Sequence, residues 1–351
     1  MKLCFELAKK GEGNVHPNPL VGAVIVKDDS IISTGYHKKY GSAHAEKNAI
    51  DNASISLTGS TLYCNLEPCM HTDKQTPPCV PAIISGNIGR VVIANTDPNK
   101  KVNGKGIEIL RAVGIEVITG ILEEEARELN RFYFKFMETG LPYVTIKIAE
   151  SLDGKISAKQ GMQTWLTGKT SRKFVHAQRS IYDAVLVGTN TINIDNPKLT
   201  VREVEGRNPM RIVLDANLNS QIDSGVFNDN ESRTIICCLS NANANKKQKL
   251  LESGAELIEF EPGHNNLINL KELLSKLASM KVTSLFVEGG GHIFEQFISQ
   301  ELFDEILVLK APVKLNSGVD WISLKQVDNL NLHRHESLGE DILFTYRKKR
   351  N

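Results

Sequence analysis

The sequence predicts two successive α/β domains, and three observations support this prediction. The chain has 351 residues, which is more than one ordinary domain usually contains. Short apolar runs typical of strands alternate with amphipathic segments typical of helices along its length. Between two such series, Gly140-Leu141-Pro142 combines a helix-stopping glycine with a proline. We therefore expect one domain at 1–142 and a second at 143–351.

The first domain is expected to hold a central sheet between layers of helices. Leu3, Leu7 and Ala8 share one helical face, and Gly11 follows them as a stop signal. The other helices are expected to start near His44 and to span 80–85, 107–113 and 123–137. The strands are expected at 20–26, 31–36, 61–66, 90–94 and 116–118.

The second domain is expected to contain a largely parallel sheet covered on both faces, because its strands and helices alternate. The expected strands are 143–148, 184–187, 211–214, 234–239, 285–287 and 306–309. The expected helices are 171–181, 246–253, 267–280 and 293–303.

The composition excludes several classes of protein. The chain is 41% apolar and 24% charged, as globular proteins are, and its formal net charge of +1 argues against a nucleic-acid partner. No apolar run is long enough to span a bilayer, and the first residues lack the apolar core of a signal peptide, so no membrane partner is expected. Four cysteines are expected as buried thiols in a reducing cytoplasm: Cys4, Cys64, Cys237 and Cys238.

His44, Cys69 and Cys79 predict a zinc site in the first domain. One histidine and two cysteines suit a tetrahedral zinc ion whose fourth position is left for water. Zinc lowers the pKa of such a water, and Glu46 can carry its proton to a leaving amine. This is the signature of zinc deaminases, although the two cysteines are further apart here than in its short form. The alternatives are a structural zinc site with His71 as fourth ligand, or unrelated buried thiols.

Two helix starts are expected to support the charges of this site. His44 and Glu46 are expected in the first turn of a helix, where backbone amides stabilise negative charge. Cys79 is expected to open the next helix, where the helix dipole favours thiolate over thiol.

Two glycine-containing turns in the second domain are candidate sites for an anionic ligand. They are Gly188-Thr189-Asn190-Thr191 and the segment 287–292, which runs from a strand into a helix. Such junctions let backbone amides approach a phosphate, but neither carries a dinucleotide fingerprint, and simple tight loops are an equal alternative. Trp165 can stack on a planar ring or lie buried in a core. Arg179, Arg202 and Arg211 are candidate phosphate contacts, although a single arginine is more often solvated or part of a surface ion pair.

Several motifs together resemble one enzyme family over nearly the whole chain. His44-Ala45-Glu46, Glu67-Pro68-Cys69 and Thr76-Pro77-Pro78-Cys79 resemble the bifunctional deaminase/reductase family of riboflavin biosynthesis. Further segments match in the same order: 18–23, 151–155, 187–189, 195–197, 199–202 and 287–290.

The resemblance implies a cytidine-deaminase-like first domain and a dihydrofolate-reductase-like second domain. The first would hydrolyse an amino group from a diamino-ribosylamino-pyrimidinone phosphate. The second would use NADPH to reduce the ribosyl group to ribityl. The implied partners are this small phosphorylated pyrimidine and further copies of the chain in a homo-oligomer.

The resemblance also implies roles for individual residues. His44, Cys69 and Cys79 would bind Zn²⁺, and Glu46 would shuttle protons. Asn18 and His37 would line the pyrimidine pocket. The implied NADPH contacts are Trp165, Thr191, Asp195, Gly290, Gly291, His292, Ile293, Phe294, Glu295 and Gln296. The implied contacts to the sugar phosphate are Arg179, Leu199, Arg202 and Glu288.

Three departures from the family pattern concern the substrate rather than the metal. The segment 70–78 is one residue longer than usual and lacks the family's serine and glycine, so its substrate contacts, including any by Lys74, are not carried over. Gln163 stands where a serine is usual, and Asn196 replaces a usual aspartate.

Two other functions are compatible with parts of the sequence. One is a deaminase of another nucleobase or of RNA, with a non-catalytic or altered second domain. The other is a non-catalytic ligand sensor stabilised by zinc. The near-zero net charge argues against RNA. Glu46 argues against the sensor, because a structural zinc site has no use for a carboxylate that does not bind the metal.

Overall fold

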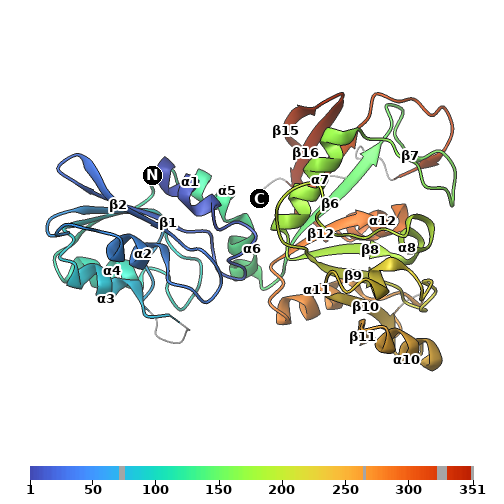
Figure 1. Cartoon of the computed structure of the whole chain (residues 1–351), viewed down its shortest axis with the longest axis horizontal. Helices are drawn as coiled ribbons and strands as arrows, with labels where there is room; N and C mark the ends of the chain where they lie inside the picture. The colour runs from blue at the N-terminus through green and yellow to red at the C-terminus, as the bar shows by residue number, and fades with distance from the viewer. Residues whose placement is uncertain (71–75, 264–265, 322–329, 349–351) are drawn as a thin grey trace. The chain divides into compact units, whose positions relative to one another are not determined.

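The computed structural model describes residues 1–70, 76–263, 266–321 and 330–348 (Figure 1). It divides into two compact units, Met1–Leu141 and Pro142–Asn351, so the division falls within the Gly140-Leu141-Pro142 segment. In the part of the chain that is described, no helix has the length and apolar character needed to cross a membrane.

The first unit contains a five-stranded sheet in the order β2-β1-β3-β4-β5. β1 is antiparallel to β2 and β3, whereas β3, β4 and β5 are parallel. The strands are β1 (Gly22–Lys27), β2 (Ser30–Tyr36), β3 (Thr61–Leu66), β4 (Arg90–Asn95) and β5 (Glu116–Ile118). The helices are α1 (Lys2–Lys9), α2 (Ala45–Asp51), α3 (Cys79–Ser85), α4 (Lys105–Ala112), α5 (Glu123–Leu129) and α6 (Arg131–Thr139).

Successive side chains of β1 point to opposite faces of this sheet. Ala23 and Ile25 pack in the main core with residues of α2 and α3, while Val24 packs beside Cys4 and Leu7 of α1. Figure 1 accordingly shows α2, α3 and α4 on one side of the sheet and α1 on the other. The expected α/β/α architecture is confirmed.

The expectation of a single helix at 123–137 is wrong, because Asn130 separates α5 from α6 with a non-helical backbone (φ −105°, ψ 24°). Its side chain is buried, and its amide oxygen accepts a hydrogen bond from the backbone nitrogen of Leu20 (2.7 Å). Its amide nitrogen donates to the carbonyl oxygen of the same residue (2.9 Å). This pairing fixes Asn130 at the break.

The second unit contains a nine-stranded sheet in the order β11-β10-β9-β8-β12-β6-β13-β16-β15. The strands are β6 (Tyr143–Glu150), β8 (Ala184–Gly188), β9 (Met210–Leu214), β10 (Thr234–Leu239), β11 (Glu256–Phe260), β12 (Ser284–Gly289), β13 (Glu305–Lys310), β15 (Leu330–Leu338) and β16 (Asp341–Lys348). The strands from β11 to β13 are parallel, and β16 and β15 are antiparallel to their neighbours. A separate two-stranded sheet pairs β7 (Lys155–Ser157) with β14 (Val319–Asp320).

The largely parallel sheet confirms the expectation for this unit, but its antiparallel end was not predicted. Most residues of β15 are exposed, so its sequence lacks the apolar run that marks a buried strand. The helices of the unit are α7 (Lys169–Ile181), α8 (Thr189–Asp195), α9 (Gly225–Asn228), α10 (Ala244–Glu252), α11 (Leu270–Ser279) and α12 (Gly291–Ser299).

Candidate functional site

The three side chains predicted to bind zinc come together in the first unit. Nδ1 of His44 lies 3.4 Å from the sulfur of Cys69 and 3.4 Å from that of Cys79, and the two sulfurs are 3.5 Å apart. Ligands about 2.0–2.3 Å from a tetrahedral zinc ion lie roughly 3.4–3.8 Å from one another. The donor set and its spacing therefore fit one zinc ion, with Nδ1 as the histidine ligand.

Backbone structure fixes the positions of these ligands. Cys69 follows β3, and its carbonyl oxygen accepts hydrogen bonds from the backbone nitrogens of Cys79 (3.0 Å) and Val80 (3.2 Å) at the start of α3. This clamp keeps the two thiols together whatever the length of the segment between them. Residues 71–75, with the proposed His71 ligand and Lys74, lie outside the described residues.

His44 differs slightly from its predicted place. It is the N-cap of α2, with an extended backbone (φ −72°, ψ 165°), rather than a residue of the first turn. Its second ring nitrogen, Nε2, lies 3.1 Å from the hydroxyl of Thr76. Partners of this kind orient a histidine ligand, and Thr76 was singled out in the sequence only as part of the Thr-Pro-Pro-Cys motif.

Glu46 is the second residue of α2, and its side chain is buried beside the triad. Burial is the largest influence on this carboxyl and raises its pKa, and negative charge on Cys69 acts in the same direction. His44 and a hydrogen bond with Cys79 oppose the shift. The cluster of possible ligand atoms contains no carboxylate oxygen of Glu46. The Glu46 side chain can therefore exchange protons at the site without binding the metal.

Asn18, which is half-buried, and His37, which is buried, form a pair next to the triad. The side-chain nitrogen of Asn18 lies 3.1 Å from Nε2 of His37, and Nδ1 of His37 lies 3.1 Å from the carbonyl oxygen of Ala43. With the amide nitrogen as donor and the carbonyl oxygen as acceptor, this geometry fits an imidazole that carries its proton on Nδ1. The His37 and His44 rings are 5.3 Å apart, so the pair lies beside the proposed zinc ligands.

A cavity of about 1240 Å³ opens in the second unit at the carboxyl ends of the parallel strands β6, β8, β9 and β12. Ligands of open parallel sheets bind at this end of the strands. The cavity brings together every residue that the resemblance implied for cofactor and sugar phosphate: Trp165, Arg179, Thr191, Asp195, Leu199, Arg202, Glu288, Gly290, Gly291, His292, Ile293, Phe294, Glu295 and Gln296.

The two glycine-containing turns pack directly on each other at this cavity. A Cβ atom on Gly289 would lie 2.6 Å from the hydroxyl of Thr191, and one on Gly188 would lie 2.9 Å from a side-chain carbon of Ile293. Gly290, with φ +93°, then leads into α12. Glycine is needed at these positions because the backbone of each turn lies directly against a side chain of the other.

A buried ion cluster forms part of the cavity wall. The carboxylate of Glu288 accepts hydrogen bonds from Nε (2.5 Å) and Nη2 (2.8 Å) of Arg179, and Nζ of Lys147 lies 3.8 Å from it. Burial alone would raise the pKa of Glu288, but Arg179 and then Lys147 hold this pKa below its usual value. Burial lowers the pKa of Lys147, although Glu288 opposes the shift.

Lys147 is the residue of this cluster that sequence reasoning missed. The available signal was a single lysine within the otherwise apolar strand at 143–148. Asp195 of α8 is the next carboxyl to influence Lys147, and burial raises the pKa of Asp195 while Lys147 lowers it.

Two residues that the sequence left ambiguous are now placed. Trp165 is 72% exposed at the cavity, with the Arg172 guanidinium 5.8 Å from the centre of its ring, so the alternative of a buried core tryptophan is wrong. Asn196 has φ +39°, which asparagine tolerates, and its side-chain oxygen accepts a hydrogen bond from the backbone nitrogen of Gly225 (2.9 Å). The departure at Asn196 therefore has a structural use at the start of α9.

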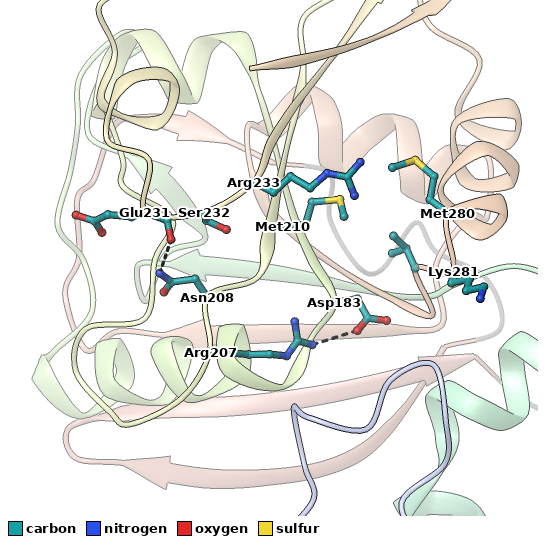
Figure 2. Close-up of a pocket in the computed structure, with 10 residues that line it drawn as sticks. Asp183, Arg207, Asn208, Met210, Glu231, Ser232, Arg233, Met280 and Lys281 are labelled. Carbon is teal, nitrogen blue, oxygen red and sulfur yellow. Dashed lines mark hydrogen bonds and ion pairs between the residues drawn. The ribbon is translucent and has the colours of Figure 1, made fainter. Parts of the chain in front are cut away.

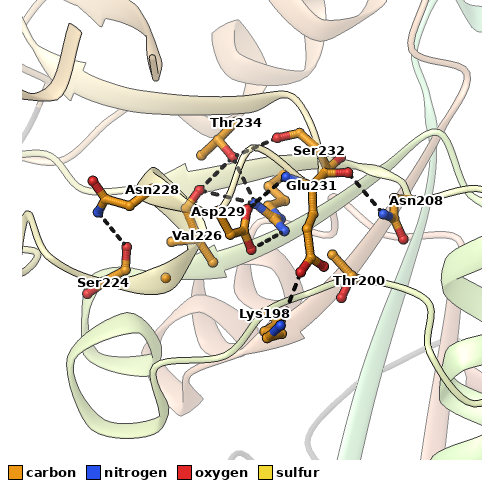
Figure 3. Close-up of polar contacts among 12 residues, drawn as sticks. Lys198, Thr200, Asn208, Ser224, Val226, Asn228, Asp229, Glu231, Ser232 and Thr234 are labelled. Carbon is orange, nitrogen blue, oxygen red and sulfur yellow. Dashed lines mark hydrogen bonds and ion pairs between the residues drawn. The ribbon is translucent and has the colours of Figure 1, made fainter. Parts of the chain in front are cut away.

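Arg211 is not available to hold a phosphate, which corrects a prediction. Its side chain is fully buried and donates two hydrogen bonds to the Asp229 carboxylate (2.7 and 2.9 Å) and one to the carbonyl oxygen of Val226 (3.2 Å). Figure 3 shows Asp229 and Val226 with Thr234 in this polar network. Arg211 neutralises a carboxylate in the interior instead.

A smaller hollow of about 500 Å³ lies at the amino ends of β9, β10 and β12. In Figure 2 the Arg207 side chain points to Asp183, whose carboxylate it contacts at 3.1 Å. None of the predicted site residues is among those that line this hollow.

Comparisons with known proteins identify the family of each part of the chain. Residues 1–95 match the family model of the cytidine and deoxycytidylate deaminase zinc-binding region, and residues 142–344 match that of the RibD C-terminal domain. The riboflavin biosynthesis protein RibD of Aquifex aeolicus is 41% identical over 99% of this chain and 97% of its own length. The RibD protein of Bacillus amyloliquefaciens is 40% identical over 98% of this chain and 94% of its own length.

A solved structure gives the same result. It is the diaminohydroxyphosphoribosylaminopyrimidine deaminase/5-amino-6-(5-phosphoribosylamino)uracil reductase of Thermotoga maritima, with a TM-score of 0.88 and 36% sequence identity. The match covers 99% of this chain and 97% of that one. The chain therefore belongs to the RibD family of riboflavin biosynthesis and is a bifunctional deaminase and reductase.

Proposed function

We propose that the two activities are divided between two domains, a zinc-dependent pyrimidine deaminase at 1–142 and an NADPH-dependent reductase at 143–351. The first would act on a diamino-ribosylamino-pyrimidinone phosphate, and the second would reduce the ribosyl group of the deaminated product to ribityl. The observation that carries the proposal is the zinc-sized triad of His44, Cys69 and Cys79 beside the buried carboxyl of Glu46.

In the first domain the chain's own residues move the protons. His44, Cys69 and Cys79 would hold zinc, which when bound lowers the pKa of a water molecule toward neutrality. Glu46 takes a proton at its carboxylate and delivers it to the departing amino group, for which its buried, non-ligating position is suited. His37 holds the Asn18 amide by a hydrogen bond and thereby orients it toward the pyrimidine.

In the second domain the cavity has room for both a cofactor and a substrate, since its volume of about 1240 Å³ exceeds that of an ordinary small-molecule pocket. NADPH would supply the hydride. The start of α12 offers backbone amides to its phosphates, and the exposed face of Trp165 offers a stacking surface. Arg179 and Arg202 would hold the sugar phosphate, with Leu199 and Glu288 beside them.

Two further proposals concern assembly and compartment. We propose a homo-oligomer, supported by β15, which forms one edge of the nine-stranded sheet and is exposed along most of its nine residues. We also propose a cytoplasmic location, supported by the buried thiols of Cys4, Cys64, Cys237 and Cys238.

The test is to supply the zinc-loaded protein with the diamino-pyrimidinone ribosyl phosphate and to follow ammonia release and NADPH oxidation together. We expect ammonia first and substrate-dependent NADPH loss after it. Ammonia without NADPH loss would contradict the proposal for the second domain. Absence of both signals would contradict the proposed substrate and direct attention to the longer 70–78 segment.

Replacement of Cys79 by serine is expected to remove zinc and to lower the thermal stability of the first domain. The variant lacks the thiolate ligand at the start of α3. Without that ligand the bound metal no longer contributes to the folding stability of the domain. Metal content, the unfolding temperature and ammonia release measure the effect. The buried thiol Cys64, replaced by serine, is the matched control, because it lies in the core of the same domain and is not one of the three proposed ligands. Unchanged zinc content in the Cys79 variant would refute the site.

A further inference from the structure

The segment Leu199–Arg202 carries two of the proposed contacts to the sugar phosphate and has an unfavourable backbone conformation. Leu199 is buried and has φ +55°, a left-handed conformation that a residue with a side chain rarely adopts. Such a conformation persists only where surrounding contacts hold it, and it occurs most often at functional sites.

Hydrogen bonds hold this segment from several directions. Nη1 of Arg179 donates to the carbonyl oxygen of Thr200 (3.2 Å). The side-chain oxygen of Asn208 accepts from the backbone nitrogen of Val201 (2.8 Å), and its side-chain nitrogen donates to the carbonyl oxygen of Glu231 (3.0 Å). Figure 3 shows the contact between Asn208 and Glu231.

The remaining contact comes from His176, which lies on α7 three residues before Arg179. Its Nδ1 accepts a hydrogen bond from the backbone nitrogen of Arg202 (3.0 Å). A backbone N–H can only donate, so Nδ1 must carry no proton, and the neutral ring keeps its proton on Nε2. The imidazole is buried and forms part of the cavity lining, whereas Arg202 is exposed.

The charges around His176 favour this neutral form. Arg179 faces it from the same helix, Arg202 and Glu203 from the segment after Leu199, and Glu288 from β12. Burial first, and then Arg179 and Arg202, lower the pKa of His176, while the two carboxylates oppose them. His176 therefore accepts the hydrogen bond at neutral pH and would lose it only in acid.

We propose that His176 is a positioning residue for reduction: its neutral Nδ1 fixes the backbone of Arg202 and thereby directs the Arg202 guanidinium to the phosphate of the substrate. This inference rests on the substrate role proposed above for Arg202. It differs from a purely structural role, which would change stability without changing the pH dependence of substrate binding.

The experiment uses the full-length zinc-loaded enzyme with 5-amino-6-(5-phosphoribosylamino)uracil supplied directly, at saturating NADPH. The rate of NADPH oxidation gives KM and kcat from about pH 5 to about pH 8. His176→Ala is expected to raise KM at neutral pH by about 5- to 10-fold, with kcat within about twofold of the wild type. NADPH affinity, measured separately, checks that each variant is folded.

His176→Asn provides the decisive comparison. Its side-chain oxygen can replace Nδ1 as the acceptor but does not titrate, so KM is expected to return to within about twofold of the wild type. In acid, KM of the wild type should rise more steeply than that of His176→Asn, in which only the substrate phosphate, with a pKa of about 6, still titrates. Asn208→Ala is the matched control, because it loosens the same segment but should keep the wild-type pH dependence.

Three outcomes would overturn the inference or its basis. Parallel pH profiles for the wild type and His176→Asn would exclude His176 as the titrating group. An unchanged KM in His176→Ala would refute the positioning role while leaving Arg202 as a substrate contact. An unchanged KM in Arg202→Ala would refute the proposed role of Arg202 itself, and the inference with it.

Discussion

Replacement of Glu46 by glutamine is expected to slow deamination by about 10²- to 10⁴-fold while zinc remains bound. Glutamine has nearly the same size and shape, so the buried position at the start of α2 is preserved. It cannot accept and return a proton as a carboxylate does. The three proposed ligand atoms belong to other residues, so the metal should stay. Ammonia release and zinc content measure the two expectations.

Glu67 offers a matched control for this variant, since it is equally buried in the same domain. Its carboxylate accepts hydrogen bonds from the backbone nitrogens of Gly104 (2.9 Å) and Gly106 (3.0 Å), where α4 begins. Glu67→Gln should therefore lower the unfolding temperature but retain most of the deaminase activity. NADPH-dependent reduction should be normal in both variants. Zinc loss in Glu46→Gln would show that the residue supports the metal, and full activity would show that another group carries the proton.

The zinc site could be predicted because its residues are chemically distinctive and its motifs are short. A histidine followed two residues later by a glutamate, and two cysteines that each follow a proline, are rare enough to indicate a metal site without any structure. The structure was needed to place His44 one residue before the helix instead of inside it, and to show its Thr76 partner.

The second domain was less predictable because its site depends on partners that are distant in sequence. Arg179 and Arg211 are both arginines of an α/β domain, yet one pairs with Glu288 at a cavity and the other with Asp229 in the interior. Sequence alone assigned them the same role. Lys147 was missed for the same reason, since nothing near it in the chain reveals that Glu288 lies opposite.

Errors in the fold have equally specific causes. The break between α5 and α6 depends on the two hydrogen bonds of Asn130 to Leu20, which no local propensity encodes. The antiparallel pair of β15 and β16 was not predicted, because β15 is mostly exposed and its pairing partner β16 cannot be recognised without it. Apolar periodicity detects buried elements, so an exposed edge is where it fails.

Replacement of Glu288 by glutamine is expected to destabilise the second domain by about 3 kcal/mol and to abolish reduction, because it leaves two buried cations without their carboxylate. The side chains of Arg179 and Lys147 are only 11% and 16% exposed, so water can compensate for the lost charge only in part. The free energy of unfolding, from urea titration, and NADPH oxidation are the measurements. Ammonia release from the first domain should be unaffected and serves as an internal control.

The ion pair between Glu256 and Arg233 separates the effect of burial from that of geometry. It has the same two-pronged contact, at 2.6 and 2.8 Å, but its side chains are 52% and 48% exposed. Glu256→Gln should therefore cost no more than about 1 kcal/mol. The pKa of Glu288 is lowered in the folded state, so its stabilisation is complete above the ordinary carboxyl pKa of about 4.3 and is lost as the pH falls through the lower folded value. The wild type should lose this contribution in acid and Glu288→Gln should not. Equal decreases in the free energy of unfolding for Glu288→Gln and Glu256→Gln would mean that burial does not govern the strength of the cluster. Normal reduction by Glu288→Gln would remove Glu288 from the proposed substrate site.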